Sequence, residues 1–227
     1  MTLSVARSSV RSVAVLTAGL GIAVGAALAC APRGPMPSTV VRAARAAESS
    51  EPVGLKVGEA APDSEFVDNN GKALKVSELR GKGPLVVVFY RGGWCPFCTK
   101  SLAAWQGRLA DLEAAGGTLV AVSLEKPSLA TAVREKHKLT YRVLADPSGD
   151  ACRAFKVLFE VDGATREKYA GYGIDLEKSN ANGKWVLPVP ATYVLDQGGT
   201  VRWSHFDADY KKRAAPDDVI AAVKAAK

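Results

Sequence analysis

The chain has 227 residues, of which 48% are hydrophobic and 23% are charged, values that exclude an intrinsically disordered protein. Its formal net charge is +7, and the basic residues are interleaved with acidic ones along the chain. No arginine-rich run or basic–aromatic alternation points to nucleic-acid binding. A chain of this length builds a core without disulfide staples, so the four cysteines need another role than scaffolding.

The first thirty residues are organised like an export signal. Arg7 and Arg11 precede an uncharged apolar stretch over residues 13–29 that ends in small residues. Ordinary signal-peptidase cleavage fits this end, and so does lipidation, because the four residues ending at Cys30 resemble a bacterial lipobox. An uncleaved anchor is the third alternative, although the stretch is short for a membrane span. We predict a signal peptide over 1–29 and an exported protein of the bacterial cell envelope, either a membrane-anchored lipoprotein or a periplasmic or secreted protein.

Residues 30–53 are rich in alanine, proline, serine and arginine and show no apolar periodicity. Pro32, Pro35 and Pro37 disfavour helix and strand there. We therefore predict a flexible tether that precedes a folded domain over residues 54–227.

The domain opens with short extended pieces over residues 55–84, in which Asn69-Asn70-Gly71 marks a hairpin turn. Residues 85–90 form a continuous apolar, β-branched run, typical of a strand buried on both faces of a parallel sheet. Pro96 suits the first turn of a helix. Apolar residues at helical spacing continue this helix until Gly116-Gly117 ends it.

Strands and helices alternate along the rest of the chain. We predict strands at 118–124, 141–145, 191–195 and 200–206, and helices at 127–138, near 152–155 and from Pro216 onward. The last two strands form an antiparallel hairpin. This order indicates an α/β, thioredoxin-like fold, with a mixed central sheet flanked by helices and an N-terminal β extension. The glycine-containing, charged stretch 162–184 fits a mobile flap near the site or an insertion.

Cys95 and Cys98 form a Cys-x-x-Cys pair where the predicted strand passes into a helix, a pattern typical of thioredoxin-like redox sites. Free N–H groups and the dipole at the helix start favour the Cys95 thiolate, and Arg91 adds to this if its side chain turns toward the sulfur. Cys98 lies one turn inward, within reach of a disulfide. A static disulfide is one alternative, and half a zinc site is another that lacks further ligand pairs. We predict Cys95 as nucleophile and Cys98 as resolving thiol.

The run from Phe89 to Cys98 resembles the signature of the peroxiredoxin-like branch of the AhpC/TSA family. Segments 57–62 and 79–82 resemble the N-terminal extension of that family, and segments 187–193 and 207–213 resemble its C-terminal half. The resemblance implies an antioxidant thiol peroxidase.

One departure from the family pattern concerns the peroxide. The typical family carries a threonine three residues before the cysteine, where this sequence has Gly92. Thr99 and Arg91 are the candidates to replace that hydroxyl. The segment around Pro190 resembles the cis-proline loop that faces the cysteine in thioredoxin-like folds. We therefore expect the peptide bond before Pro190 to be cis. Trp94 shields the site and offers contact area to partners.

Three functions are compatible with these residues. In the first, Cys95 reduces a small hydroperoxide, Cys98 captures the sulfenic acid, and an external thioredoxin-like dithiol regenerates the pair. In the second, the protein is an envelope thiol–disulfide oxidoreductase that acts on protein disulfides. In the third it delivers copper, with His205 as third ligand. No organic cofactor is implied, because the cysteines carry the electrons. Cys152 fits a buried apolar filler better than a second resolving thiol.

Overall fold

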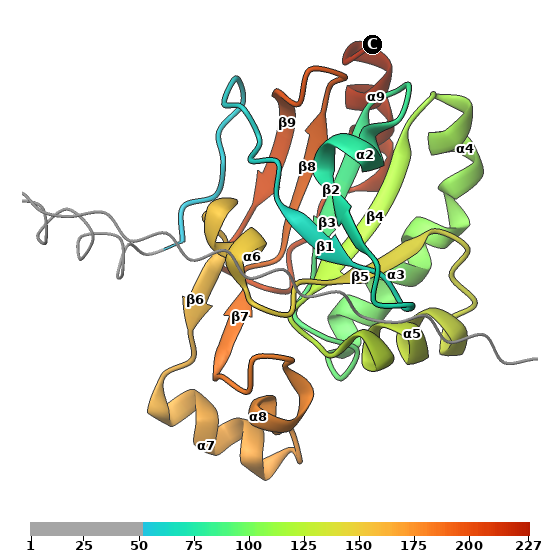
Figure 1. The fold of residues 1–227 in the computed structure, drawn as a ribbon. Coiled ribbons are helices and arrows are strands. Elements are labelled where there is room, and N and C mark those ends of the chain that lie inside the picture. Colours follow the sequence, from blue (N-terminus) through green and yellow to red (C-terminus); the bar gives the residue numbers. More distant parts are fainter. Residues whose placement is uncertain (1–51) are drawn as a thin grey trace, which may run out of the picture. The chain divides into compact units, whose positions relative to one another are not determined.

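The computed structural model describes residues 52–227 of the chain (Figure 1). The predicted signal peptide over 1–29, the lipidation of Cys30 and nearly all of the tether lie outside the described residues. Within the described part, no helix combines the length and the apolar character that crossing a membrane requires.

A seven-stranded mixed sheet forms the centre of the domain over residues 52–227. Its strands are β1 (Glu65–Val67), β2 (Ala73–Lys75), β3 (Leu85–Phe89), β4 (Thr118–Ser123), β5 (Arg142–Ala145), β8 (Ala191–Leu195) and β9 (Val201–Phe206). They follow the order β2-β1-β5-β4-β3-β8-β9 (Figure 1). β3, β4 and β5 are parallel neighbours, whereas β8 runs antiparallel to both β3 and β9. The hairpin of β1 and β2 adds the predicted N-terminal extension at one edge.

Helices cover both faces of this sheet, as the sequence predicts. They are α2 (Val76–Arg80), α3 (Pro96–Gly107), α4 (Leu109–Ala114), α5 (Pro127–Lys136), α6 (Asp150–Ala154), α7 (Gly163–Gly171), α8 (Leu176–Ser179) and α9 (Pro216–Ala225). Side chains of α3, α4, α5 and α9 join Val86 and Val88 in one core layer. Those of α2 and α6 join Leu85, Val87 and Phe89 on the opposite face, because successive side chains of a strand alternate.

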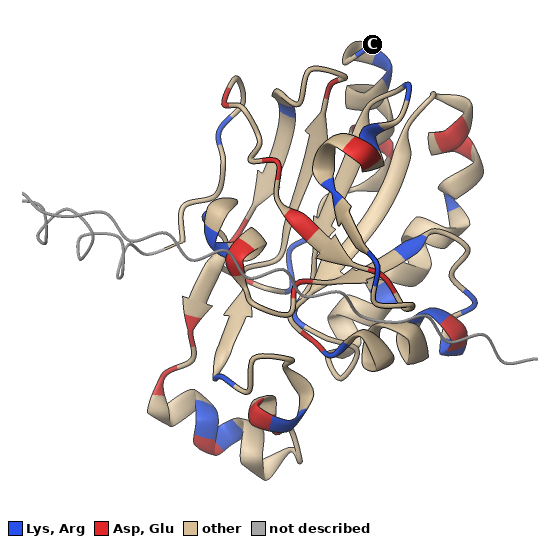
Figure 2. Cartoon of the chain, in the orientation of Figure 1, with Lys and Arg blue, Asp and Glu red and all other residues tan. Residues whose placement is uncertain are grey.

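The central strands are apolar and buried. Figure 2 shows the positions of the charged residues on helices, loops and outer strands, whereas β3, β4 and β8 contain no charged residue. All five side chains of β3 are buried, and burial of each large aliphatic side chain contributes about 1.5–3 kcal/mol. The strand therefore forms a rigid support for the loop that follows it.

The helix that begins at Pro96 is shorter than predicted. The sequence indicates one helix up to Gly116, but α3 ends at Gly107 and α4 begins at Leu109. Glycine lowers helix propensity by about 1 kcal/mol, and Arg108 adopts non-helical angles (φ −119°, ψ 9°). The Arg108 guanidinium forms ion pairs with Asp111 and with Asp217 of α9, which ties the break to the C-terminal helix.

The stretch 162–184 is folded and lies beside the cysteine loop. Its two helices, α7 and α8, follow β6 (Leu158–Glu160), which pairs antiparallel with β7 (Val186–Pro188). Asp162 caps α7 by accepting a hydrogen bond from the backbone N–H of Thr165 at 2.8 Å. The Tyr169 ring packs against Trp94, with the ring centroids 5.4 Å apart. The segment therefore forms one wall of the region around Trp94.

Candidate active site

Cys95 directly precedes α3. Figure 1 shows the loop that joins β3 to this helix. It is the N-cap residue of α3, with extended backbone angles (φ −90°, ψ 115°), and Pro96 occupies the first helical position. A proline is favourable there because the N–H it lacks would have no helical partner. The structure thus places Cys95 at the helix start, as the sequence predicts. The residue is only 2% exposed.

The two thiols of the pair have opposite acidities. A hydrogen bond from Cys98 is the largest influence on the pKa of Cys95, which is lowered from its ordinary value of 9.0 to about 6. Backbone N–H groups of Phe97 and Cys98 and the charge of Arg91 act in the same direction, whereas burial opposes them. The same hydrogen bond, together with burial, raises the pKa of Cys98. Both thiols are free in this structure, so the site is in its reduced form, with one sulfur ionised and one protonated at neutral pH.

Arg91 is held among aromatic rings near Cys95. Its guanidinium carbon lies 4.2 Å from the ring centroid of Tyr210, 5.1 Å from that of Trp94 and 5.5 Å from that of Tyr169. The residue is 5% exposed, and no carboxylate forms an ion pair with it among residues 52–227. A cation so placed is stabilised by the ring faces, and its charge remains available to the neighbouring thiolate.

The other predicted residues near the pair have distinct surroundings. The Thr99 hydroxyl donates to the Pro96 carbonyl oxygen at 3.1 Å, so its hydrogen is used within the helix. Trp94 is half-buried, and its indole N–H has no hydrogen-bond partner. Phe97 is 39% exposed and packs edge-on against Tyr210, with ring centroids 5.5 Å apart. Trp94 and Tyr210 pack against the core layer that contains Cys95, and Phe97 extends this aromatic group.

The predicted cis bond at Pro190 is wrong, since no peptide bond within residues 52–227 is cis. β7 ends at Pro188 and β8 begins at Ala191, so the chain continues between two strands in this region. The backbone N–H of Val189 also donates to the carbonyl oxygen of Val157 at 2.8 Å. A continuing extended chain favours the trans isomer, because cis proline serves tight turns.

Two charged residues of the site escaped the sequence reasoning. Arg213 donates from its Nη2 to the Cys98 Sγ at 3.4 Å. It belongs to a segment that carried the family resemblance, but nothing local indicated this contact. Glu125 follows β4 and accepts a hydrogen bond from the Gly93 N–H at 2.8 Å. Its place beyond the carboxyl end of a parallel strand was a signal that could have found it.

Arg213 also lines a small pocket behind the pair. The pocket is bounded by Val88, Phe89, Ser101, Pro190, Ala191, Thr192, His205, Arg213 and Ala214. Its volume is about 10 Å³, close to the space that one water molecule needs. Pro190 therefore lines the same pocket as Arg213, the residue that contacts Cys98.

The remaining candidate residues lie apart from the redox pair or lack partners. Cys152 is fully buried in the core layer on the opposite face of the sheet from Cys95 and Cys98. This placement fits the predicted apolar filler. His205 is half-buried and stacks on Trp203, with ring centroids 6.4 Å apart. In residues 52–227, no three His, Cys, Asp or Glu side chains come together as metal ligands.

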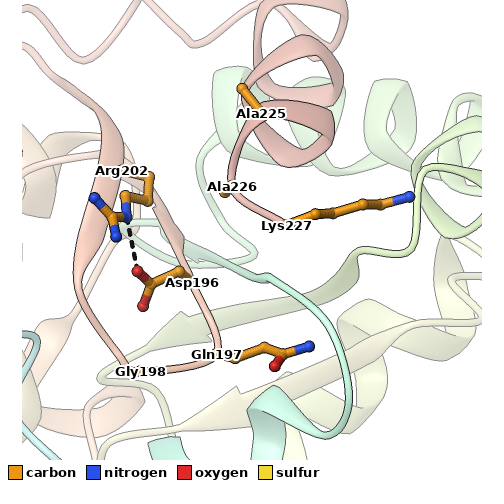
Figure 3. Close-up of a pocket in the computed structure, with 7 residues that line it drawn as sticks. All are labelled: Asp196, Gln197, Gly198, Arg202, Ala225, Ala226 and Lys227. Carbon is orange, nitrogen blue, oxygen red and sulfur yellow. Dashed lines mark hydrogen bonds and ion pairs between the residues drawn. The ribbon is translucent and has the colours of Figure 1, made fainter.

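A second hollow lies between the β8–β9 turn and the C-terminal end of the chain (Figure 3). It is bounded by Asp196, Gln197, Gly198, Arg202, Ala225, Ala226 and Lys227. The Arg202 Nε donates to the Asp196 carboxylate at 2.7 Å, so these two charges satisfy each other. None of the predicted site residues lines this hollow.

Comparison with known proteins gives a consistent result. The AhpC/TSA family model matches residues 57–204. A chloroplastic peroxiredoxin Q of Populus jackii is 31% identical over 145 residues, which are 64% of this chain and 57% of that protein. The corresponding protein of Gentiana triflora is 29% identical over 145 residues, 64% of this chain and 56% of its own length. The chain thus spans a little over half the length of these plant relatives.

The fold is similar to that of solved peroxiredoxin structures. The crystal structure of peroxidoxin BcpB from Mycobacterium tuberculosis aligns with a TM-score of 0.60 at 21% identity, covering 76% of this chain and 99% of that one. At this identity the likeness concerns the fold, and it confirms the thioredoxin-like α/β architecture predicted from the sequence.

Proposed function

This chain belongs to the AhpC/TSA family, and from that premise and the geometry of its site we propose that it is a thiol-dependent peroxidase. The observation that carries the proposal is the Cys95 thiol at the start of α3, with its pKa lowered to about 6 and Cys98 hydrogen-bonded to it. At neutral pH the Cys95 side chain is then mostly ionised, and the thiolate is the form that attacks peroxides.

The reaction proceeds in two steps. The Cys95 thiolate attacks one oxygen of ROOH, the O–O bond breaks, and the departing alkoxide takes a proton to leave as ROH. The sulfur is now a sulfenic acid. Cys98 attacks it, the S–S bond forms, and the hydroxyl leaves with the Cys98 proton as water. An external dithiol of the thioredoxin type then supplies two electrons and two protons to restore both thiols.

Arg91 takes the role of activating residue in this proposal. Its guanidinium is buried beside Cys95 and pairs with no carboxylate among the described residues, so it offsets the thiolate charge. The backbone N–H groups of Phe97 and Cys98 also stabilise the negative charge of the Cys95 thiolate. In this proposal they also stabilise the charge that develops on oxygen as the O–O bond breaks. In this proposal these groups replace the threonine hydroxyl that is absent at Gly92. Thr99 cannot replace it, because its hydroxyl hydrogen is already donated to the Pro96 carbonyl oxygen.

The enclosure of Cys95 separates this function from the oxidoreductase alternative. A protein disulfide must approach the sulfur in line, which a residue only 2% exposed does not allow in this conformation. A small hydroperoxide needs much less room around the sulfur than a folded protein does. We therefore favour a small hydroperoxide over a protein disulfide as the substrate.

The proposal is tested by mixing the reduced protein with hydrogen peroxide and, separately, with a model protein disulfide. Trp94 lies next to Cys95 and reports its oxidation through indole fluorescence. We expect rapid oxidation by peroxide, none in Cys95→Ser, and a sulfenic acid trapped by dimedone in Cys98→Ser. Peroxide loss at buffer level with fully reduced protein would refute the peroxidase. Faster reaction with the protein disulfide would favour the oxidoreductase.

Export and anchoring are a separate proposal that rests on residues 1–53. We propose that the signal is cleaved before Cys30 and that the lipidated cysteine tethers the domain to a bacterial envelope membrane. The intact mass of the mature protein, expressed with its own leader, tests this. A diacylglycerol adduct on Cys30, lost in Cys30→Ala, supports lipidation, and an unmodified mature N-terminus indicates a periplasmic or secreted protein.

A further inference from the structure

A buried carboxyl group lies behind the turn that leads to Cys95. Glu125 is 3% exposed, and its Oε2 accepts a hydrogen bond from the Gly93 N–H at 2.8 Å. The residue lies two positions after β4 and forms an antiparallel bridge with Asn180, which itself follows α8. Its backbone is thus held from two sides, and its side chain has a fixed base from which to hold the turn.

The turn packs tightly against this carboxyl group. A Cβ added at Gly92 would lie 2.3 Å from the Trp94 indole nitrogen and 3.0 Å from Glu125 Oε1. One added at Gly93 would lie 2.2 Å from a methyl group of Val133 on α5 and 3.7 Å from Glu125 Oε2. Both glycines are therefore required for the turn to fit between Glu125, Trp94 and Val133. Cys95 follows two residues later, and its N–H donates to the Gly92 carbonyl oxygen at 3.2 Å. A shift of this turn moves the nucleophile.

Glu125 has no charge partner among residues 52–227. The groups that face it are Tyr90 just after β3, the Gly93 N–H, the Trp94 indole, Val133 of α5 and Asn180 after α8. Tyr90 is the only titratable one, and burial raises its pKa far above its ordinary value, so it stays protonated. Burial also raises the pKa of Glu125 to about 7. Glu125 thus changes charge in the physiological range while its neighbours do not.

We propose that Glu125 is a positioning residue for the peroxidase. As a carboxylate it holds the Gly92–Gly93 turn and keeps Cys95 at the start of α3. Its protonation loosens the turn and lowers the rate at which the Cys95 thiolate reacts with peroxide. This inference rests on the proposed function and adds a pH dependence distinct from the ionisation of Cys95. The physical basis is that a hydrogen bond to a charged acceptor is about twice as strong as one to a neutral acceptor.

The experiment separates positioning from ionisation. Thiolate content is measured by absorbance at 240 nm and the rate constant with hydrogen peroxide by stopped flow, both between pH 5 and 9, on reduced protein. Their quotient is the rate per thiolate. In the wild type we expect the quotient to rise about fivefold with a midpoint near pH 7, as a weakened charged hydrogen bond implies. In Glu125→Gln, whose amide oxygen still accepts from Gly93 but does not titrate, we expect a flat quotient.

Two further variants complete the test. Glu135→Gln removes an exposed carboxylate from α5, the helix that contacts Gly93, and should keep the wild-type profile. Glu125→Asp keeps the charge but is too short for the same contact, and should lower the quotient at every pH. A flat wild-type quotient overturns the inference even if Glu125→Gln does not fold, and so does a step that persists in Glu125→Gln. A protein that forms thiolate but consumes no peroxide at any pH refutes the proposed function instead.

Discussion

Removal of the Cys98 thiol should weaken the nucleophile itself as well as the resolving step. The hydrogen bond from Cys98 is the first cause of the low pKa of Cys95, which falls from 9.0 to about 6. A fall of this size corresponds to about 4 kcal/mol of preference for the thiolate. A hydrogen bond to a charged group contributes about 1.5–3 kcal/mol, so its loss should move the titration midpoint up by about one to two pH units.

The matched variants are Cys98→Ala, which removes the donor, and Cys98→Ser, which keeps one. Absorbance at 240 nm from pH 4 to 10, with the titration of Cys95→Ser subtracted, gives the midpoint of Cys95. At pH 7 we expect roughly nine-tenths thiolate in the wild type and a several-fold smaller fraction in Cys98→Ala, with a matching loss in the rate of the first oxidation. Cys98→Ser should lie close to the wild type. A midpoint near 6 in Cys98→Ala would refute this reasoning and assign the acidity to Arg91 and the helix start.

Three further outcomes follow from the site. Arg91→Gln keeps a planar polar group among the rings but removes the charge, and should raise the thiolate midpoint and slow peroxide reduction about tenfold, as stopped flow would show; an unchanged midpoint would contradict the role of its charge. Gly93→Ala places a methyl group on Val133 and should lower the free energy of unfolding by about 1–3 kcal/mol in urea titrations, with partial recovery in a double variant with Val133→Ala. The raised pKa of Glu125 means that the folded state binds more protons than the unfolded one between about pH 4.5 and 7, so stability from this group falls as pH rises through that window. Glu125→Gln should therefore be less sensitive to pH than the wild type in urea titrations at pH 5 and 8, and an equal loss in both proteins would contradict this.

The strands and the cysteine pair could be predicted because local sequence determines them. The apolar run of β3, the proline after Cys95 and the turn between β8 and β9 each act over a few residues, and the bounds predicted for β8 match the structure. The folded segment around α7 was missed because its helices are short and bury few apolar side chains of their own. Glu125 and Arg213 were missed because each meets the site only through the tertiary fold, across 32 residues to Gly93 and 115 residues to Cys98.

The rings around Arg91 come from three separate parts of the chain, since Trp94 precedes α3, Tyr169 belongs to α7 and Tyr210 follows β9. The aromatic surroundings of Arg91, whose charge adds to the hydrogen bonds of Cys98 and Phe97 in lowering the pKa of Cys95, are therefore complete only when all three segments have docked. In the unfolded chain Cys95 is an ordinary thiol, about 3% ionised at neutral pH. Such a cysteine is largely protected from premature oxidation while the polypeptide is being made, and it gains its reactivity as folding is completed.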